Sequence, residues 1–388
     1  MHIYDYIVIG SGLSGLTIAS QISQESENVL LLEAEHVFGG AHRAATLKSQ
    51  TLENGLRFFP YSEISEKSLL HLEDFLGLKL IKNIQENHPE TYEASGFKSF
   101  VGFGDKSPAF YDQFSYFLSS KEIELTLPVF KIVELLKEKF KGEYLPKSIV
   151  TRFNIEDNKV ASVTVNGSKT YAAQNFIFCG NVRELIQLIP DDNFSLRAKS
   201  KLKKDTSWIA VCMDLYHAKA EGGNLVEKNN LFVLNGTTDD DIGPCVGRFH
   251  PAATDFSTTA NQEYQISQWV SFVDVEAAEE TENIAEVLKK VKRQIKRAFP
   301  EMSENIKGER LFISSALSCG PIKMNSNGTF HKIENLWIGS GQVNPFPNLL
   351  GTLLQSQMTL ASLGFAPEVI LPTNSQDKSE TVDADTEA

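Results

Sequence analysis

A glycine-rich run near the start of the chain has the residue types and the spacing that bind a dinucleotide. Gly10, Gly12 and Gly15 follow a short apolar run at 6–9. The first glycine permits a tight turn, the second lets the backbone approach a pyrophosphate at a helix N-terminus, and the third permits close packing of helix on strand. Glu33 stands 18 residues after Gly15 at the end of the next apolar run, so its carboxylate can accept hydrogen bonds from ribose hydroxyls.

This combination favours NAD or FAD as the cofactor. Strand, helix, second strand and acidic residue follow one another in register, which is more specific than three glycines alone. The acidic residue disfavours the 2′-phosphate of NADP. A purely structural glycine turn is the alternative interpretation. The contacts expected from this segment are made by Gly10, Ser11, Gly12, Leu13, Ser14, Gly15, Glu33 and Ala34.

The elements that position the motif form a predicted β-α-β unit, with strands at 5–10 and 28–33 and a helix at 13–24. Parallel strands that are apolar throughout are typical of a layered α/β fold. Strands are also expected at 148–156 and 159–165, with a hairpin signal at 157–158, and at 175–179. The later runs at 207–216, 231–234, 246–250 and 264–273 indicate an antiparallel sheet, and helices are expected at 129–140 and 282–299.

Residues 53–125 predict irregular structure that is rich in aromatic side chains. Two interpretations stay open for this segment: the core of a second domain, or the lining of an apolar substrate cavity. Arg248, Phe249 and His250 end a predicted strand, where they either face a substrate or form an exposed strand end. The histidines form no ligand-spaced pair, so no metal site is expected, and the sequence names no catalytic acid or base.

The charge of the chain excludes one class of partner. Lys and Arg number 37 against 50 Asp and Glu among 388 residues, which gives a formal net charge of -13. This charge repels phosphate backbones, so nucleic acid is not expected as a partner. No apolar run is long enough to span a bilayer, so no transmembrane segment is expected, and peripheral membrane contact stays open.

The cysteines and the termini indicate a compartment. The four cysteines lie far apart without C-x-x-C spacing, so we expect buried free thiols and a reducing environment. No basic segment precedes the first apolar run, which argues against a secretory signal and for a cytoplasmic protein. Residues 372–388 are acidic and lack aromatic side chains, which predicts a disordered tail. The cysteines are Cys179, Cys212, Cys245 and Cys319.

Two segments resemble a known family. Residues 31–40, in which Gly39 and Gly40 follow the acidic residue, resemble the extended signature of FAD-binding amine oxidases, protoporphyrinogen oxidases and phytoene desaturases. Residues 334–341, continuing through 344–351, resemble the closing motif of that family. In the family this motif is a strand and a glycine-rich turn that meet the ribityl-phosphate of the flavin before a helix runs beneath the isoalloxazine.

The resemblance implies FAD as the cofactor and adds residues to its expected site. Residues 51–55 match the segment that brings the chain to the flavin, so the three residues that follow would lie close to the ring. Val150 occupies the place of a valine whose backbone contacts adenine. The residues implied in this way are Gly39, Gly40, Arg43, Gly55, Leu56, Arg57, Phe58, Val150, Gly339, Ser340, Gly341, Leu349 and Leu350.

The chain also departs from the family pattern. Many members have an arginine directly after the Gly-Gly pair, whereas this chain has Ala41, with Arg43 as a substitute for the pyrophosphate contact. Many members carry an acidic residue where Ser340 stands. The run at 208–213 lacks the lysine that amine oxidases commonly place near the flavin, which argues against amine oxidation by that arrangement. No cysteine falls within the closing motif, so non-covalent binding of FAD is expected.

Together these features predict an α/β protein with a Rossmann-type FAD-binding domain and an inserted α+β substrate domain that contains an antiparallel sheet. The predicted FAD-binding segments are 1–60, 128–190 and 305–371, the predicted substrate-domain segments are 61–127 and 191–304, and 372–388 is the tail.

The resemblance implies dehydrogenation or desaturation of a small, fairly apolar substrate. Hydride would pass to the flavin N5 and then to oxygen, a quinone or another acceptor. One alternative is an amine oxidase of the same family. Others are a non-catalytic protein like the GDP dissociation inhibitors and a mutase like the UDP-galactopyranose mutases. The intact Gly15 and Glu33 argue against the inhibitors, and residues 56–60 lack the histidines expected of the mutases.

Overall fold

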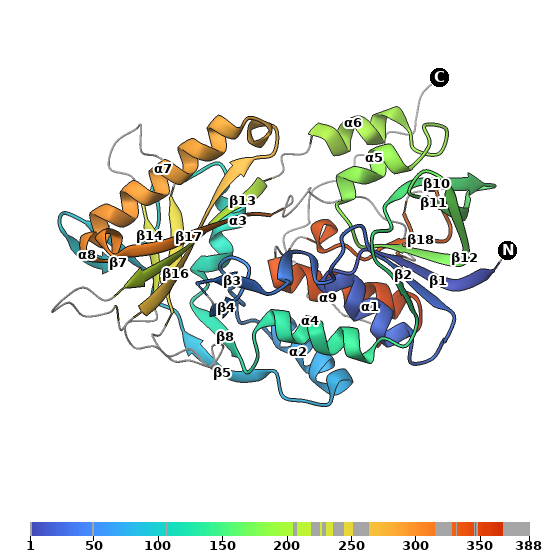
Figure 1. The fold of residues 1–388 in the computed structure, drawn as a ribbon, viewed down its shortest axis with the longest axis horizontal. Coiled ribbons are helices and arrows are strands. Elements are labelled where there is room, and N and C mark those ends of the chain that lie inside the picture. Colours follow the sequence, from blue (N-terminus) through green and yellow to red (C-terminus); the bar gives the residue numbers. More distant parts are fainter. Residues whose placement is uncertain are drawn as a thin grey trace, which may run out of the picture.

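The computed structural model describes residues 2–48, 50–105, 107–204, 208–218, 226, 230–235, 244–250, 264–314, 328–330, 332–344, 346 and 348–367. These residues form two lobes, each built around a β-sheet, that lie side by side along the longest axis (Figure 1). The predicted tail at 372–388 and Cys319 lie outside the described residues.

The first lobe contains the predicted β-α-β unit. Its strands run in the order β10-β11-β12-β1-β2-β9, and β18 pairs with β12. Strands β18, β12, β1, β2 and β9 are parallel, whereas β10 and β11 form an antiparallel hairpin. The α/β fold class is therefore confirmed. The bounds are β1 Ile3–Ile9, α1 Leu13–Ile22, β2 Val29–Leu32, β9 Glu143–Leu145, β10 Val150–Glu156, β11 Lys159–Val165, β12 Lys169–Phe178 and β18 Leu336–Ile338.

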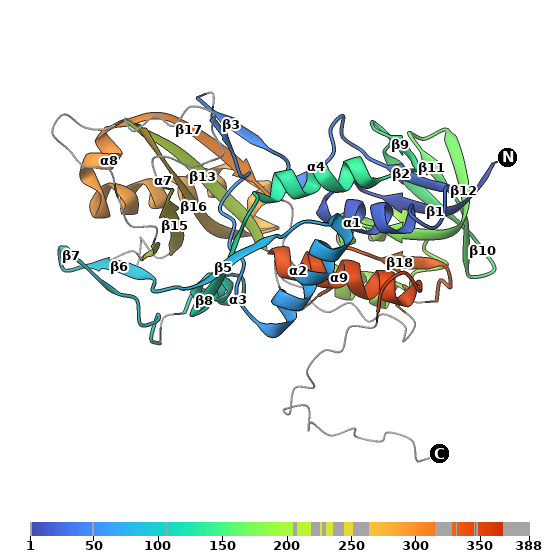
Figure 2. The same ribbon diagram turned by 90° about the horizontal axis from the view of Figure 1, so that it is seen from below.

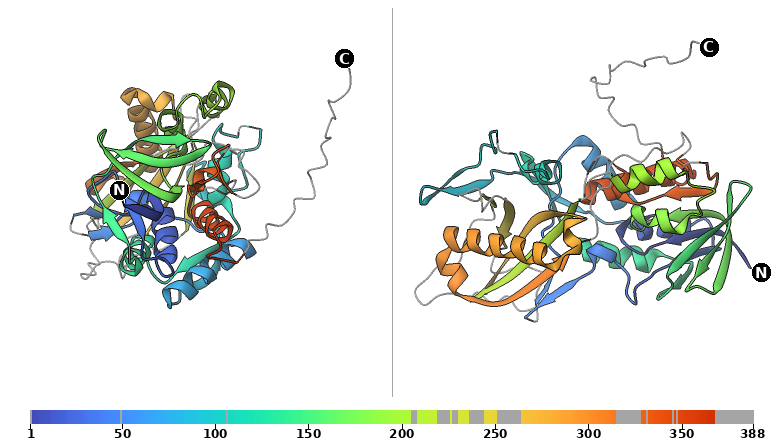
Figure 3. Two further views of the ribbon diagram at one scale, coloured as in Figure 1. Left: turned by 90° about the vertical axis from the view of Figure 1, so that its right-hand side faces the viewer. Right: turned by 90° about the horizontal axis from the view of Figure 1, so that it is seen from above.

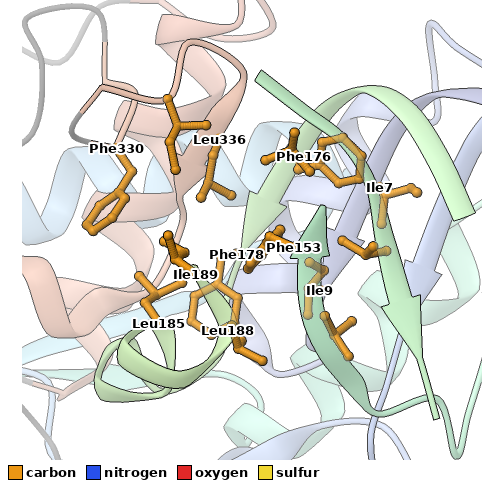
Figure 4. Close-up of a cluster of buried hydrophobic side chains, with 14 of the residues drawn as sticks. Ile7, Ile9, Phe153, Phe176, Phe178, Leu185, Leu188, Ile189, Phe330 and Leu336 are labelled. Atoms are coloured by element: carbon orange, nitrogen blue, oxygen red, sulfur yellow. The ribbon is translucent and has the colours of Figure 1, made fainter. Parts of the chain in front are cut away.

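Alternate residues at the end of β1 pack on opposite faces of this sheet. Ile7 and Ile9 join a core with β10, β12 and α5 (Figure 4). Val8 joins a core with α1, α2, α4 and α9, which lie together on the other face (Figure 2). Because both faces are covered, the strand needs no polar side, which explains its unbroken apolar run. The helices are α2 Glu63–Leu76, α4 Val129–Lys139, α5 Leu185–Leu188, α6 Leu196–Lys204 and α9 Asn348–Ser362.

The second lobe contains the antiparallel sheet that the sequence predicts. Its strands run in the order β17-β13-β16-β15-β14-β6-β7, and only the contact of β14 with β6 is parallel. Helix α7 covers one face (Figure 3), and an aromatic cluster covers the other. The bounds are β6 Glu90–Glu93, β7 Gly96–Ser99, α3 Tyr111–Ser115, β13 Trp208–Ala218, β14 Leu231–Leu234, β15 Cys245–Phe249, β16 Tyr264–Asp274, α7 Thr281–Ala298, α8 Pro300–Glu304 and β17 Ile306–Ile313.

The segment 53–125 is not irregular, contrary to the prediction. It contains α2, which begins at a capping box formed by Ser62 and Ser65 and ends at Gly77 with a φ of 72°. Its aromatic residues mostly pack in the core of the second lobe, and Phe117 also lines a cavity, so both interpretations of this segment hold in part. Short strand pairs complete the segment and its surroundings: β3 Ala45–Leu47 with β4 Gln50–Leu52, and β5 Ile81–Glu86 with β8 Lys121–Leu125.

Three elements belong to a different lobe from the one that the predicted domain boundaries assign to them. Strand β17 falls in the FAD-binding segment expected from 305, but it pairs with β13 in the second sheet. Helices α2 and α6 fall in segments expected in the substrate domain, but they pack in the two cores of the first lobe. These groupings depend on contacts between segments far apart in the chain, which sequence periodicity does not encode.

Of the cysteines, Cys179, Cys212 and Cys245 are free, with Cys212 and Cys245 buried and Cys179 half-buried. Among the helices that the structure describes, none combines the length and the apolar character needed to cross a membrane.

Arg248 is neither an exposed strand end nor a residue that lines the cavity described below; it forms a buried ion pair. Its Nη1 and Nη2 donate to Oε1 and Oε2 of Glu122 at 2.9 and 2.5 Å, and both residues are at most 7% exposed. Glu122 lies on β8 and Arg248 on β15, so the pair ties the two-stranded β5–β8 sheet to the second lobe's sheet. Removing one partner of such a pair leaves an uncompensated buried charge.

We expect Glu122→Gln to lower the free energy of unfolding by about 3–5 kcal/mol, because Arg248 would stay buried without its counter-charge. Glu124→Gln is the matched control on the same strand. Glu124 pairs with Lys82 at 2.7 Å at the surface, so its loss should cost less than about 1 kcal/mol. Urea unfolding of both variants measures the difference, and equal losses would contradict a structural role for the buried pair.

Candidate cofactor and substrate cavity

A cavity of about 370 Å³ extends from the glycine-rich turn of the first lobe to the aromatic face of the second sheet. Such volumes are typical of small-molecule sites. Residues from both lobes line it, among them Gly10, Gly12, Glu33, Ala34, Gly40, His42, Leu56, Arg57, Phe117, Val150, Glu184, Ala210, Cys212, Val270, Phe272, Phe312, Ser314, Ser340, Gly341 and Thr352.

The three glycines of the first motif have different steric surroundings. Gly10 has a φ of 100°, in the region that favours glycine. A Cβ on Gly15 would lie 1.8 Å from the carbonyl oxygen of Gly10, so only glycine lets α1 pack this closely on the end of β1. A Cβ on Gly12 would meet no atom within 4 Å, although Gly12 lines the cavity. The second glycine therefore leaves open space at the N-terminus of α1, where the helix dipole favours an anion.

The Gly-Gly pair lies directly against this turn. Gly39 adopts a φ of 104°, and its N–H donates to the carbonyl oxygen of Ser11 at 2.8 Å. A Cβ on Gly40 would lie 3.2 Å from Cα of Gly12. The two motifs, which are separate in the sequence, thus form one wall of backbone around the start of α1.

The carboxylate of Glu33 holds the turn in place as well as lining the cavity. Its Oε2 accepts hydrogen bonds from the N–H and Oγ of Ser11 at 2.7 and 2.6 Å, and its Oε1 accepts one from the N–H of Glu35 at 2.8 Å. Ala34 and Val150 line the cavity beside it. This end therefore contains the carboxylate that the motif spacing predicts for ribose and the valine that the family resemblance implies for adenine.

The closing motif joins the same site from the C-terminal part of the chain. The Oγ of Ser14 donates to the carbonyl oxygen of Gly339, and Gln355 Nε2 donates to that of Ile338 at 2.8 Å. A Cβ on Gly341 would lie 2.7 Å from the backbone N of Thr352, so glycine permits the close contact with α9. These contacts place the turn after β18 beside α1.

The second sheet supplies an apolar wall at the other end of the cavity. Cys212 on β13 lies opposite Val270 of β16 and Phe312 of β17, so alternate residues of three strands share one face. Gly55 lies against this face, since a Cβ there would approach Sγ of Cys212 to 2.8 Å. Burial raises the pKa of the Cys212 thiol to about 12, which keeps it neutral.

Apart from Arg43, the site residues predicted from the sequence fall into two groups. Twelve line the cavity: Gly10, Gly12, Leu13, Ser14, Glu33, Ala34, Gly40, Leu56, Arg57, Val150, Ser340 and Gly341. Others support that wall or pack in the cores: Ser11, Gly15, Gly39, Gly55, Phe58, Gly339, Leu349 and Leu350.

Arg43 differs from this expectation. Its side chain is exposed and is not among the residues that line the cavity. Arg57 enters the cavity instead, and its Nη2 donates to the carbonyl oxygen of Ala41 at 2.5 Å.

Several lining residues were not predicted. His42, Glu184, Cys212, Phe272 and Phe312 line the cavity. Strand alternation could have shown that Cys212 and Phe272 have defined faces, but no signal in the sequence indicates that this face lies opposite the segment after Gly55.

Comparison with known proteins agrees with this architecture. Residues 8–72 match the model of an NAD(P)-binding Rossmann-like domain. Solved structures extend the likeness to nearly the whole chain. An oxidoreductase from Methanosarcina mazei is 12% identical, with a TM-score of 0.68 over 92% of this chain and 99% of that one. Wild-type putrescine oxidase with bound putrescine is 11% identical, with a TM-score of 0.63 over 93% and 99%.

A protein from Exiguobacterium sp. assigned as a protoporphyrinogen oxidase is 11% identical, with a TM-score of 0.61 over 94% of this chain and 99% of that one. The chain therefore shares the fold of these proteins. At these identities the likeness shows the fold alone, and it confirms the fold that the resemblance of the two sequence signatures implies. The residues that match the Rossmann-like domain include Gly12 and Glu33, which line one end of the cavity.

The open space at Gly12 yields a prediction for two alanine variants. Gly12→Ala should leave the unfolding temperature of the ligand-free protein unchanged, because its Cβ meets nothing. The same methyl group would occupy space needed by a pyrophosphate and should weaken dinucleotide binding at least about tenfold. Titration with FAD and with NAD, together with thermal unfolding, measures both effects.

Gly15→Ala should behave in the opposite way. Its Cβ would clash with the backbone of Gly10, so we expect a loss of about 3 kcal/mol of stability or more before any ligand is added. If Gly12→Ala were the less stable variant, or if it bound dinucleotide like the wild type, the placement of the pyrophosphate at this turn would be wrong.

Proposed function

We propose that the chain is an FAD-dependent oxidoreductase that dehydrogenates or desaturates a small, largely apolar organic substrate. The observation that supports this most strongly is the single cavity that connects a dinucleotide-binding turn to an apolar wall on another sheet. In the family that the chain resembles, the closing motif meets the ribityl-phosphate of the flavin, and here Ser340 and Gly341 of that motif line the same cavity as the glycine-rich turn. The two sequence signatures of that family favour FAD.

Each end of the cavity has residues suited to one part of FAD. The N-terminus of α1 with Gly12 and Gly40 would hold the diphosphate, Glu33 the ribose, and Val150 the adenine. Ser340 and Gly341 would contact the ribityl chain. When bound, FAD would supply the hydride acceptor and would later be reoxidised by oxygen, a quinone or another acceptor. We propose non-covalent binding.

The wall of the second sheet would orient the substrate and exclude water. Leu56, Phe117, Val270, Phe272 and Phe312 are apolar and line this end of the cavity. An apolar environment favours binding of an apolar substrate and strengthens electrostatic interactions at the reacting atoms. The sequence and this geometry point to chemistry carried by the cofactor, with side chains that position the substrate.

The charged groups of the cavity favour this substrate over an amine. Among the described residues that line the cavity there is no lysine, the residue that amine oxidases commonly place near the flavin. The two carboxylates that line the cavity, those of Glu33 and Glu184, belong to the first lobe. The apolar wall of the second sheet therefore provides no counter-charge for a cationic amine. Oxidation of amines remains the second candidate, because the fold is shared with putrescine oxidase.

An absorbance spectrum of the purified protein tests the cofactor. We expect flavin bands near roughly 375 and 450 nm, and release of FAD into the supernatant on acid precipitation because no covalent link is proposed. A colourless protein that takes up no added FAD would contradict the oxidoreductase assignment and favour a binding protein like the GDP dissociation inhibitors. Flavin retained in the precipitate would contradict non-covalent binding.

Anaerobic mixing with candidate substrates then tests the substrate class. Polyenes and sterol-like compounds should bleach the 450 nm band, and diamines such as putrescine should not, because the apolar wall lacks a counter-charge. Bleaching by amines alone would contradict the apolar substrate and support the amine oxidase alternative. Photoreduced enzyme serves as the reference for full bleaching.

A further inference from the structure

Arg57 is the one residue with a permanent positive charge among the described residues that line the cavity. Its guanidinium is held near the first turn of α1. Nη2 donates to the carbonyl oxygen of Ala41 at 2.5 Å, and Ala41 follows Gly40, which lies against Gly12. The charge is therefore fixed at the wall that the two glycine motifs build.

Two polar atoms at this wall lack partners. Nε of Arg57 and Nδ1 of His42 are buried and make no hydrogen bond with the described residues. Buried polar atoms in proteins nearly always have a partner. Both residues line the cavity, so a polar ligand that enters it can reach their side chains. An anionic, oxygen-rich group could accept hydrogen bonds from Nε of Arg57 and from Nδ1 of His42 in the tautomer that carries a proton there.

The protonation states decide which side chain carries the charge. Burial and the neighbouring Arg57 lower the pKa of His42 well below its usual value, so its imidazole is neutral at pH 7. Burial raises the pKa of the nearby Glu53 carboxyl, which weakens it as a counter-charge to Arg57; its Oε1 accepts a hydrogen bond from the N–H of Val129 at 2.5 Å. Arg57 is therefore the fixed cation here, with His42 as a neutral hydrogen-bonding group.

We propose that Arg57, assisted by His42, binds the diphosphate of the dinucleotide and takes the place of the arginine that related proteins have at the position of Ala41. The carbonyl oxygen of Ala41 anchors the guanidinium, and it also accepts a hydrogen bond from Nδ2 of Asn54 at 3.4 Å. Arg43, the substitute expected from sequence spacing, is exposed and does not line the cavity. An arginine fits this role because its planar fork can make two hydrogen bonds to phosphate oxygens.

This inference rests on the proposed FAD site, but its test does not depend on redox activity. Calorimetric titration with FAD, ADP and adenosine separates the diphosphate from the ring and from the nucleoside. We expect Arg57→Gln to weaken FAD and ADP alike by about 10- to 100-fold, the loss of one charge-assisted contact, and to leave adenosine within about twofold. Arg57→Lys should lose less, because it keeps the charge without the fork.

Two further arginine variants give the comparison. Arg43→Gln tests the expectation from sequence spacing and should bind FAD and ADP like the wild type. Arg293→Gln removes an exposed arginine of α7, the helix behind the second sheet, and serves as the matched control for loss of one positive charge. Thermal unfolding of each ligand-free variant checks the fold. If Arg57→Gln does not fold, Arg57→Lys replaces it in the test, because lysine keeps the positive charge opposite Glu53. The lysine variant should then bind FAD and ADP measurably more weakly than the wild type and bind adenosine equally well.

Several results would overturn the inference. If Arg57→Gln bound ADP like the wild type while weakening FAD, Arg57 would serve the flavin ring and not the diphosphate. If Arg43→Gln weakened ADP and Arg57→Gln did not, the sequence expectation would be right. If the wild type bound ADP but not FAD, the proposed function would be contradicted. Titration of the variants with ADP would then still test the role of Arg57. A wild type that binds neither would contradict both.

Discussion

The contact between Gly15 and Gly10 is the constraint on which the rest of the site depends. A single added carbon at Gly15 would lie 1.8 Å from the carbonyl oxygen of Gly10. Because this carbon is missing, the first turn of α1 packs onto the end of β1, and its N-terminus faces the cavity. The Gly-Gly pair and the closing motif then pack against that turn, through Ser11 and Ser14. Three segments from both ends of the chain meet at one helix terminus.

The two sheets supply different kinds of surface to this cavity. The first is parallel and covered on both faces, and it presents backbone and a carboxylate at the ends of its strands, where α/β folds commonly bind ligands. The second is antiparallel, and one face is covered by α7 while the other faces the cavity with apolar side chains. The buried pair of Glu122 and Arg248 joins the β5–β8 pair of strands to β15 of the second sheet.

Local patterns predict local structure well in this chain. The β-α-β unit, the helix at 129–139 and strands β13, β14, β15 and β16 of the second sheet follow from apolar periodicity and turn residues, whereas β6, β7 and β17 were not predicted. The pairing of β17 with β13 and the packing of α2 on the first lobe do not follow, because they depend on contacts between distant segments. The site shows the same division. Glycine spacing identifies the turn. That Arg57 lines the cavity and Arg43 does not depends on the contact of residues 54–57 with Ala41, the residue after the Gly-Gly pair.

A crystal structure of the protein with FAD tests the central claim most directly, that one cavity holds the cofactor between both lobes. The account predicts adenine beside Val150, the diphosphate at the N-terminus of α1, and the isoalloxazine next to the wall that contains Cys212 and Phe272. FAD bound outside this cavity would contradict the account. So would a complex in which the adenosine part occupies the first lobe while the ring turns away from the second sheet.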